Sequence, residues 1–191
     1  MARPVVHTDS LRQELLAVTA DLVDRDGPAR VTLRDVAAAA RTSTTAVYSL
    51  FGGKSQLLTA VVDDGFRSFH ESQVAAAEGG LQGLGVAYRT WALEHQALYR
   101  LMFGGALAAY VDCQPTPDVA ADAMVPLIGA VAAAQSAGTL RLAPVDMVAV
   151  AIWGQVHGLV SLELAQVGPP DADWGAAYSA ALDAVARGWA A

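Results

Sequence analysis

The chain has 191 residues, of which 54% are hydrophobic and 16% are charged, with a formal net charge of −7 at pH 7. This length suits one medium or two small domains with a buried core, and the abundant alanine favours closely packed helices. The single cysteine, Cys113, excludes an internal disulfide, and the N-terminal residues lack the apolar core of a signal peptide. We therefore expect a cytoplasmic protein in a reducing compartment.

The negative charge is distributed unevenly along the chain. Residues 1–60 contain seven basic and six acidic side chains, a balance of +1, whereas residues 61–191 contain five basic and thirteen acidic side chains, a balance of −8. The first part can therefore present a locally basic surface although the whole chain is acidic. Its near-neutral balance argues against tight, non-specific coating of nucleic acid.

The first predicted helix begins at Thr8 or Asp9, after a frayed arm of residues 1–7. It carries an apolar stripe at helical spacing and ends at Asp26-Gly27-Pro28. Its apolar stripe consists of Leu11, Leu15, Val18, Leu22 and Val23.

Two short helices joined by a tight corner are predicted in the next segment. Thr32 and Ser43 are each placed to cap one of them, because a hydroxyl can accept hydrogen bonds from the free amides of a first helical turn. The second of these helices, Thr44 to Phe51, turns apolar side chains inward and leaves Thr44, Thr45, Tyr48 and Ser49 facing out. Such an exposed face after a corner is typical of a helix-turn-helix whose second helix enters the major groove.

Roughly residues 8–60 resemble the DNA-binding domain of the tetracycline-repressor (TetR) family. The residues that carry the resemblance, in the family's order, are Thr32, Val36, Ala37, Ala40, Ser43, Val47, Tyr48, Phe51 and Lys54. The sequence departs from the family pattern at Arg41, where glycine is usual, at Thr42, where an aliphatic residue is usual, and at Leu50, where many members have a polar residue. A corner glycine tolerates positive φ, so Arg41 either costs about 1 kcal/mol or gives the corner another geometry.

Four residues are the main candidates for DNA contact. Thr44 and Thr45 begin the recognition helix, where their hydroxyl and methyl groups can reach base edges. The resemblance implies a phosphate contact for Tyr48, and Lys54 lies beside a helix N-terminus that favours anions. The alternatives are exposed helix positions for the threonines, core packing for Tyr48 and a solvated surface lysine for Lys54. Secondary candidates, for contacts with the DNA backbone, are Thr32, Arg41 and Ser43.

The remainder of the chain is predicted to be helical throughout. A long helix from Ser55 to about Ala77 would link the two parts mechanically, and no extended strand-like alternation follows it. The sequence therefore predicts an all-α fold of about nine helices. Its N-terminal three-helix helix-turn-helix domain would be residues 1–54, and its C-terminal ligand-binding and dimerisation bundle would be residues 55–191.

Two segments of the second part, 88–104 and 151–164, resemble the TetR effector domain called WHG, whose letters fall here on Trp153, His157 and Gly158. Aromatic and polar residues in an aliphatic environment are typical of pockets in helical bundles, although each also fits an ordinary core. His95 and His157 have no carboxylate or cysteine at ligand spacing, so we expect no metal and no cofactor. The candidate ligand-binding residues are Tyr88, Trp91, His95, Tyr99, Met102, Phe103, Tyr110, Met124, Trp153 and His157.

The last two predicted helices carry apolar residues on one face that we expect to be too apolar for water. The resemblance implies that these helices pair with a partner's copies in a four-helix bundle of a C₂ homodimer. Such a dimer would place two recognition helices about 34–36 Å apart on a palindromic operator in double-stranded DNA. The candidate interface residues are Val148, Ile152, Val156, Val160, Tyr178, Leu182 and Val185.

The longest apolar run, between Asp146 and Glu163, has 16 residues, which is shorter than the roughly 20 needed to span a bilayer. We expect a buried or interface helix rather than a membrane segment.

The resemblance implies a transcriptional regulator, a repressor that a small apolar effector releases from its operator. The alternative is a helical small-molecule carrier without sequence-specific DNA binding. No nucleophile–base pair, paired acids or phosphate-binding loop favours an enzyme.

Overall fold

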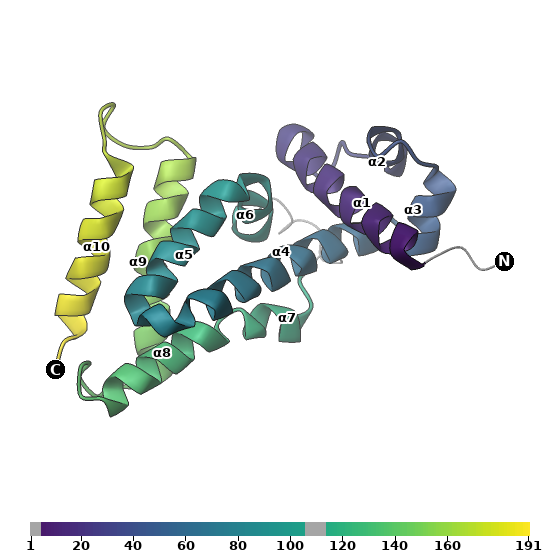
Figure 1. Ribbon diagram of the computed structural model, residues 1–191. Coiled ribbons are helices and arrows are strands. Elements are labelled where there is room, and N and C mark those ends of the chain that lie inside the picture. Colours follow the sequence, from purple (N-terminus) through teal and green to yellow (C-terminus); the bar gives the residue numbers. More distant parts are fainter. Residues whose placement is uncertain (1–4, 106–113) are drawn as a thin grey trace. The chain divides into compact units, whose positions relative to one another are not determined.

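A computed structural model describes residues 5–105 and 114–191 (Figure 1). These residues form ten α-helices and one short 3-10 helix, which confirms the predicted all-α class. Within the described part of the chain, the only β feature is an isolated antiparallel bridge between Leu140 and Ala190.

The chain divides into two compact units. Unit 1 consists of residues 1–68 and 95–120, and unit 2 consists of residues 69–94 and 121–191. The boundary predicted after residue 54 lies inside unit 1, because the first part of α4 (Lys54–Ala76) and the whole of α6 (Gln96–Phe103) belong with the N-terminal helices. Helix α4 contributes residues to both units.

Unit 1 contains α1 (Val5–Asp26), α2 (Leu33–Ala39), α3 (Thr44–Phe51), the start of α4, α6 and the start of α7 (Pro117–Asp122). Helix α1 is tied to α6 by Arg100, which donates to both carboxylate oxygens of Asp24 at 2.7 and 2.8 Å. This pairing lowers the pKa of the Asp24 carboxyl below its usual value. The core of the unit includes Leu15, Leu16, Val23, Val36, Val47, Leu57, Leu58 and Val61.

The start of α7 is held by a buried carboxylate on α4. Asp63 accepts hydrogen bonds from the backbone N–H of Thr116 at 2.8 Å and from its hydroxyl at 2.7 Å. These bonds satisfy a donor immediately before the first helical residue, where a helix has free amides. The first part of α4 therefore positions a segment that lies more than fifty residues further along the chain.

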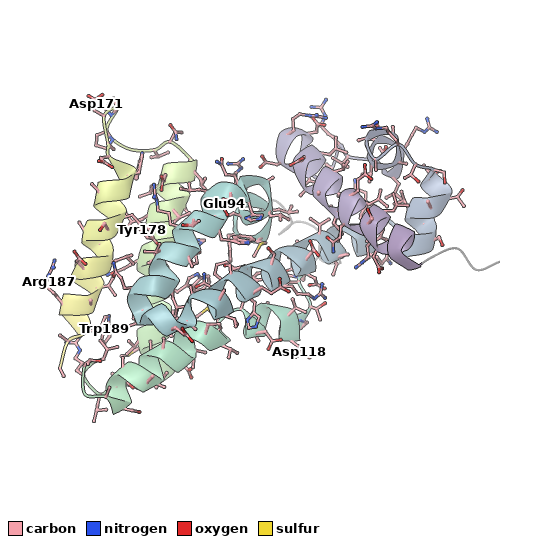
Figure 2. The ribbon with its side chains drawn as sticks, in the orientation of Figure 1. Glu94, Asp118, Asp171, Tyr178, Arg187 and Trp189 are labelled. Atoms are coloured by element: carbon pink, nitrogen blue, oxygen red, sulfur yellow. The ribbon has the colours of Figure 1, made fainter. Side chains whose placement is uncertain are left out.

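Unit 2 contains the end of α4, a 3-10 turn (Ala77–Gly79), α5 (Gly80–Glu94), α8 (Val125–Ser136), α9 (Val145–Leu164) and α10 (Trp174–Trp189). Helices α5 and α10 approach closely at Gly85, where a Cβ would lie 2.5 Å from the Leu182 Cδ2. Tyr178 on α10 (Figure 2) donates its hydroxyl to the Gly85 carbonyl at 2.7 Å. Helices α5 and α9 are joined by Arg89, which donates to both carboxylate oxygens of Glu163 at 2.8 and 2.6 Å.

Two helical stretches, Pro117–Ser136 and Val145–Leu164, are long and apolar enough to cross a membrane when judged by length and composition alone. Helix α9 is the second of them, and its residues Val148, Ile152 and Val160 are buried in the protein core. The length and composition of these two stretches are weak evidence for a membrane segment, because core helices pass the same test.

Candidate DNA-binding surface and effector cavity

Helix α2 begins at a complete capping box. The Thr32 hydroxyl oxygen accepts from the Asp35 backbone N–H at 3.3 Å, and the Asp35 carboxylate accepts from the Thr32 N–H at 3.0 Å. The Thr32 hydroxyl also donates to the Asp35 carboxylate at 2.6 Å, and this bond, followed by the one from the Thr32 N–H, lowers the pKa of the Asp35 carboxyl. The reciprocal pair satisfies two backbone donors and fixes where the helix starts, so the predicted cap at Thr32 is confirmed.

The corner after α2 is a Schellman motif without a glycine. Thr42 donates its N–H to the Ala37 carbonyl at 2.8 Å, and Arg41 donates its N–H to the Ala38 carbonyl at 3.1 Å. Arg41 adopts φ 49°, so the arginine itself takes the left-handed conformation for which the family pattern uses glycine. The corner geometry is therefore kept, at a conformational cost of about 1 kcal/mol.

Helix α3 presents polar side chains to solvent. The Ser43 hydroxyl accepts from the Ala46 N–H at 3.1 Å, which confirms this predicted cap. Val47 and Phe51 are buried, and the Arg12 guanidinium lies 4.7 Å from the Phe51 ring centroid. Tyr48 is 57% exposed, so the alternative of core packing is wrong for this residue. Thr45 and Ser49 are also exposed, and Thr44 is partly exposed.

Lys54 is the first residue of α4 and follows a corner at Gly52, which has φ 85°. Its ammonium donates to the Ala29 carbonyl at 3.3 Å and thereby links α4 to the segment before α2. An ammonium group has three N–H donors, so this bond leaves donor capacity for an anion. Lys54 is thus held in place beside the helix-turn-helix by a bond to a neutral carbonyl, which does not neutralise its charge.

Unit 2 contains a cavity between its helices, with about 440 Å³ of empty space when its open mouth is counted. It opens among the end of α4, α5, α8, α9 and α10, and hydrocarbon and aromatic groups make up most of its wall. Its lining residues are Phe69, Gln73, Leu81, Leu84, Gly85, Tyr88, Ala123, Met124, Leu127, Ile152, Trp153, Val156 and Leu182.

One corner of this cavity is polar. The Tyr88 hydroxyl lies 2.9 Å from the Nδ1 of His157 and accepts from the Trp153 indole N–H at 3.3 Å. The other ring nitrogen of His157, Nε2, lies 3.4 Å from the Ser161 hydroxyl. Burial lowers the pKa of the His157 imidazole, which favours its neutral form.

Known proteins resemble both parts of the chain. Residues 15–61 match the family described as bacterial regulatory proteins of the tetR family, and residues 81–185 match the tetracycline repressor-like C-terminal domain. The second match alone covers more than half of the chain. The chain belongs to the TetR family.

Solved structures share the fold of the chain. A Rhodococcus sp. RHA1 protein of unknown function is 26% identical, with 95% of this chain and 96% of that chain covered and a TM-score of 0.79. A TetR family transcription regulator from Marinobacter aquaeolei VT8 is 20% identical, with 95% of this chain and 96% of that chain covered and a TM-score of 0.76. A TetR-family transcriptional regulator from Pectobacterium atrosepticum is 23% identical, with 98% of each chain covered and a TM-score of 0.70. The last two likenesses show the fold alone. No curated protein sequence matches the chain.

The cavity of this TetR protein includes only part of the predicted ligand-binding set. Tyr88, Met124 and Trp153 line it, and His157 bonds to Tyr88 behind the wall. Trp91 is buried against Phe69, with ring centroids 5.4 Å apart, and is not a lining residue. Four predicted residues belong to unit 1 instead, and Tyr110 lies outside the described residues. The four are His95, Tyr99, Met102 and Phe103.

The sequence did not distinguish most of the lining residues from ordinary core. They are aliphatic residues at helical spacing, and only the packing of five separate segments shows which of them border empty space. Their one available signal was the cluster of glycines in α5, which permits close helix contacts. The lining residues missed as ligand contacts are Phe69, Gln73, Leu81, Leu84, Gly85, Ala123, Leu127, Ile152, Val156 and Leu182.

The seven residues predicted for the dimer interface are all buried within the single protomer. Helices of the same unit cover them, and three also line the cavity. The seven are Val148, Ile152, Val156, Val160, Tyr178, Leu182 and Val185. A different face of α9 and α10 is exposed, and it carries Met147, Val150, Ala151, Gly154, Leu162, Ala177, Ala180 and Ala184.

Proposed function

We propose that this TetR-family transcriptional regulator is a cytoplasmic repressor that binds a palindromic operator as a homodimer and leaves it when a small apolar effector occupies the unit 2 cavity. The observation that carries the proposal is the exposed α3 face of Thr45, Tyr48 and Ser49, held between two capped corners. Side chains of this kind reach base edges and phosphates when a recognition helix lies in the major groove.

The support for a dimer is the exposed apolar and small-residue face of α9 and α10. Val150 is 56% exposed and Met147 is 50% exposed, and both lie on the side of α9 opposite its buried face. A second copy of the chain would remove these groups from water. A C₂ pair of recognition helices spaced one DNA turn apart would then read two half-sites.

Release by an effector requires that the ligand prefer a conformation with lower operator affinity. The support for this step is that α4 begins at Lys54, beside the helix-turn-helix, and ends in the wall of the cavity through Phe69 and Gln73. A ligand that displaces these side chains would act on the same helix that carries Lys54.

The DNA-binding part is tested by selecting an operator from random duplexes and titrating it by fluorescence anisotropy over a salt series. We expect Lys54→Gln to weaken binding about tenfold and to lower the slope of log affinity against log salt by about 0.9 per protomer, as for one lost phosphate contact. Glutamine is polar but uncharged, so the lower slope would report the loss of the charge. Tyr48→Phe should weaken binding with little change in slope, because no cation is removed.

The matched control is Arg67→Gln, which removes the same charge about 20 Å further along α4 and should leave the slope unchanged. An equal loss of slope in both variants would contradict a contact at Lys54. If no duplex is enriched, and any residual binding to DNA does not depend on salt, the protein would instead be the small-molecule carrier.

A further inference from the structure

The effector cavity is uncharged. None of the described residues that line it carries a formal charge, and the lining residues with polar side-chain groups are Gln73, Tyr88 and Trp153. The Gln73 amide meets the backbone of α5, and in the orientation that satisfies both of its polar atoms its NH₂ donates to the Leu84 carbonyl and its oxygen accepts from the Tyr88 N–H, each at 3.3 Å. The polar part of the wall is thus concentrated where Tyr88 meets Trp153.

A charged ligand would be poorly accommodated in this wall. Burying a carboxylate or an ammonium without a partner costs several kcal/mol or forces neutralisation, as a rough guide. Arg89 does not supply a partner, because its guanidinium is engaged by both Glu163 oxygens and borders a separate hollow between α5 and α10. The cavity therefore discriminates against ions.

The polar corner is built as a hydrogen-bond relay. Trp153, His157 and Ser161 follow one another at intervals of four residues on α9, so they share one face of that helix. The distances from Tyr88 to His157 and from His157 to Ser161 are 2.9 and 3.4 Å. A neutral imidazole has one donor and one acceptor nitrogen, so its two tautomers run this relay in opposite directions.

The reversal of the relay changes what Tyr88 offers to a ligand. In one tautomer the Tyr88 hydroxyl donates to His157 Nδ1 and offers an oxygen lone pair. In the other, His157 Nδ1–H and Trp153 Nε1–H both donate to the Tyr88 oxygen, and the hydroxyl hydrogen can turn to a ligand oxygen. Tyr88 can therefore accept from an alcohol or donate to a carbonyl, in both cases without a change in net charge.

We propose that the effector is an uncharged, largely apolar molecule with a single hydroxyl or carbonyl oxygen, and that the Tyr88 hydroxyl binds this oxygen. His157 and Ser161 are positioning residues that act through Tyr88. This inference rests on the proposed function, because it specifies the ligand of the same cavity.

The test uses four probes with one carbon skeleton: toluene, benzyl alcohol, benzoate and benzylammonium. Their affinities for the full chain are measured by tryptophan fluorescence and by the shift in unfolding temperature at fixed protein concentration. We expect both neutral probes to bind and the two ions to bind about a hundredfold more weakly. Tyr88→Phe should weaken benzyl alcohol about fivefold, the value of one hydrogen bond, and leave toluene within about twofold.

Two variants separate this role from a general loss of structure. Tyr178→Phe removes another buried hydroxyl, which bonds to the Gly85 carbonyl rather than to the relay, and should leave the affinity ratio of benzyl alcohol to toluene unchanged. Ser161→Ala removes the far end of the relay and should lower that ratio about twofold. A structural defect alone would weaken both neutral probes together.

Three results would overturn the proposal: no binding of any probe, benzoate or benzylammonium binding as tightly as benzyl alcohol, or Tyr88→Phe weakening toluene and benzyl alcohol equally. Operator titrations on the same samples keep the two proposals apart. Tyr88-dependent binding of benzyl alcohol with unchanged operator affinity would support the ligand class and contradict effector release. Release by benzoate would support effector release and contradict an uncharged ligand.

Discussion

The two candidate sites obtain their geometry in different ways. The caps and the corner of the helix-turn-helix are shaped by hydrogen bonds between residues at most five positions apart, such as Ser43 with Ala46 and Thr42 with Ala37. The effector cavity is shaped by contacts across the fold, such as Tyr88 with His157 and Gly85 with Leu182. The first site points its polar side chains outward, and the second encloses them.

This difference indicates how each site responds to mutation. A cap or corner can be changed with a local cost, because neighbouring helices keep their own packing. The cavity wall belongs to the core of unit 2, so a change there alters both stability and shape. We therefore expect the largest effects on stability from substitutions at close contacts in unit 2 and smaller effects from substitutions in the helix-turn-helix.

The strongest test of the comparison is Gly85→Ala on α5. Its new Cβ would lie 2.5 Å from the Leu182 Cδ2, and we expect the overpacking to lower the free energy of unfolding by about 2 kcal/mol. The matched control is Gly129→Ala on α8, where a Cβ would have no neighbour within 4 Å, and we expect it to stabilise by about 0.8 kcal/mol through helix propensity. Urea unfolding of both variants measures the two values. A stabilising Gly85→Ala would show that α5 and α10 adjust freely.

The same contrast explains what could be predicted from the sequence. The sequence predicts the caps at Thr32 and Ser43 and the exposure of Tyr48, because these features depend on residue type and helical spacing over a few positions. The fold class followed from long runs of that spacing. Ile152 and Val156 on α9 were equally periodic, but periodicity cannot show whether a helix face meets another helix, a partner or a cavity. Periodicity alone therefore did not show that these side chains are buried within the single protomer.

A smaller effect is expected at the start of the recognition helix. Ser43→Ala removes the hydroxyl that accepts from the Ala46 N–H, and we expect the free energy of unfolding to fall by about 1 kcal/mol. Ser49→Ala, which removes an exposed hydroxyl from the same helix, should change it by less than about 0.5 kcal/mol. Chemical unfolding at one protein concentration compares the variants. Equal losses would mean that the cap does not determine the local stability of α3.

The corner should respond in the opposite direction. Arg41 has φ 49°, a conformation that glycine adopts without the steric cost of a Cβ, so Arg41→Gly should stabilise by about 0.5 kcal/mol. Arg41→Gln also removes the charge but keeps a Cβ and the ordinary backbone cost of this region, so it separates the backbone effect from the charge. Thermal unfolding with operator titration would measure both. A destabilising Arg41→Gly would show that the arginine side chain contributes more than its backbone costs.

The smallest effect is expected from pH at the polar corner of the cavity. Burial lowers the pKa of His157 in the folded protein, so the unfolded chain, with an ordinary value of about 6.5, binds the proton more readily. His157 therefore lowers the free energy of unfolding as the pH falls through and below that value, and it has no such effect well above it.

His157→Gln removes this titration while keeping a side chain that can hydrogen-bond. The difference in unfolding free energy between wild type and variant should be constant above about pH 7.5. Toward about pH 5.5 it should shift in favour of the variant. The other histidines are present in both proteins, so their titration cancels in this difference. A shift in favour of the wild type would mean that the folded protein stabilises the protonated imidazole, whose two N–H groups would donate to Tyr88 and Ser161, and the relay could then not reverse.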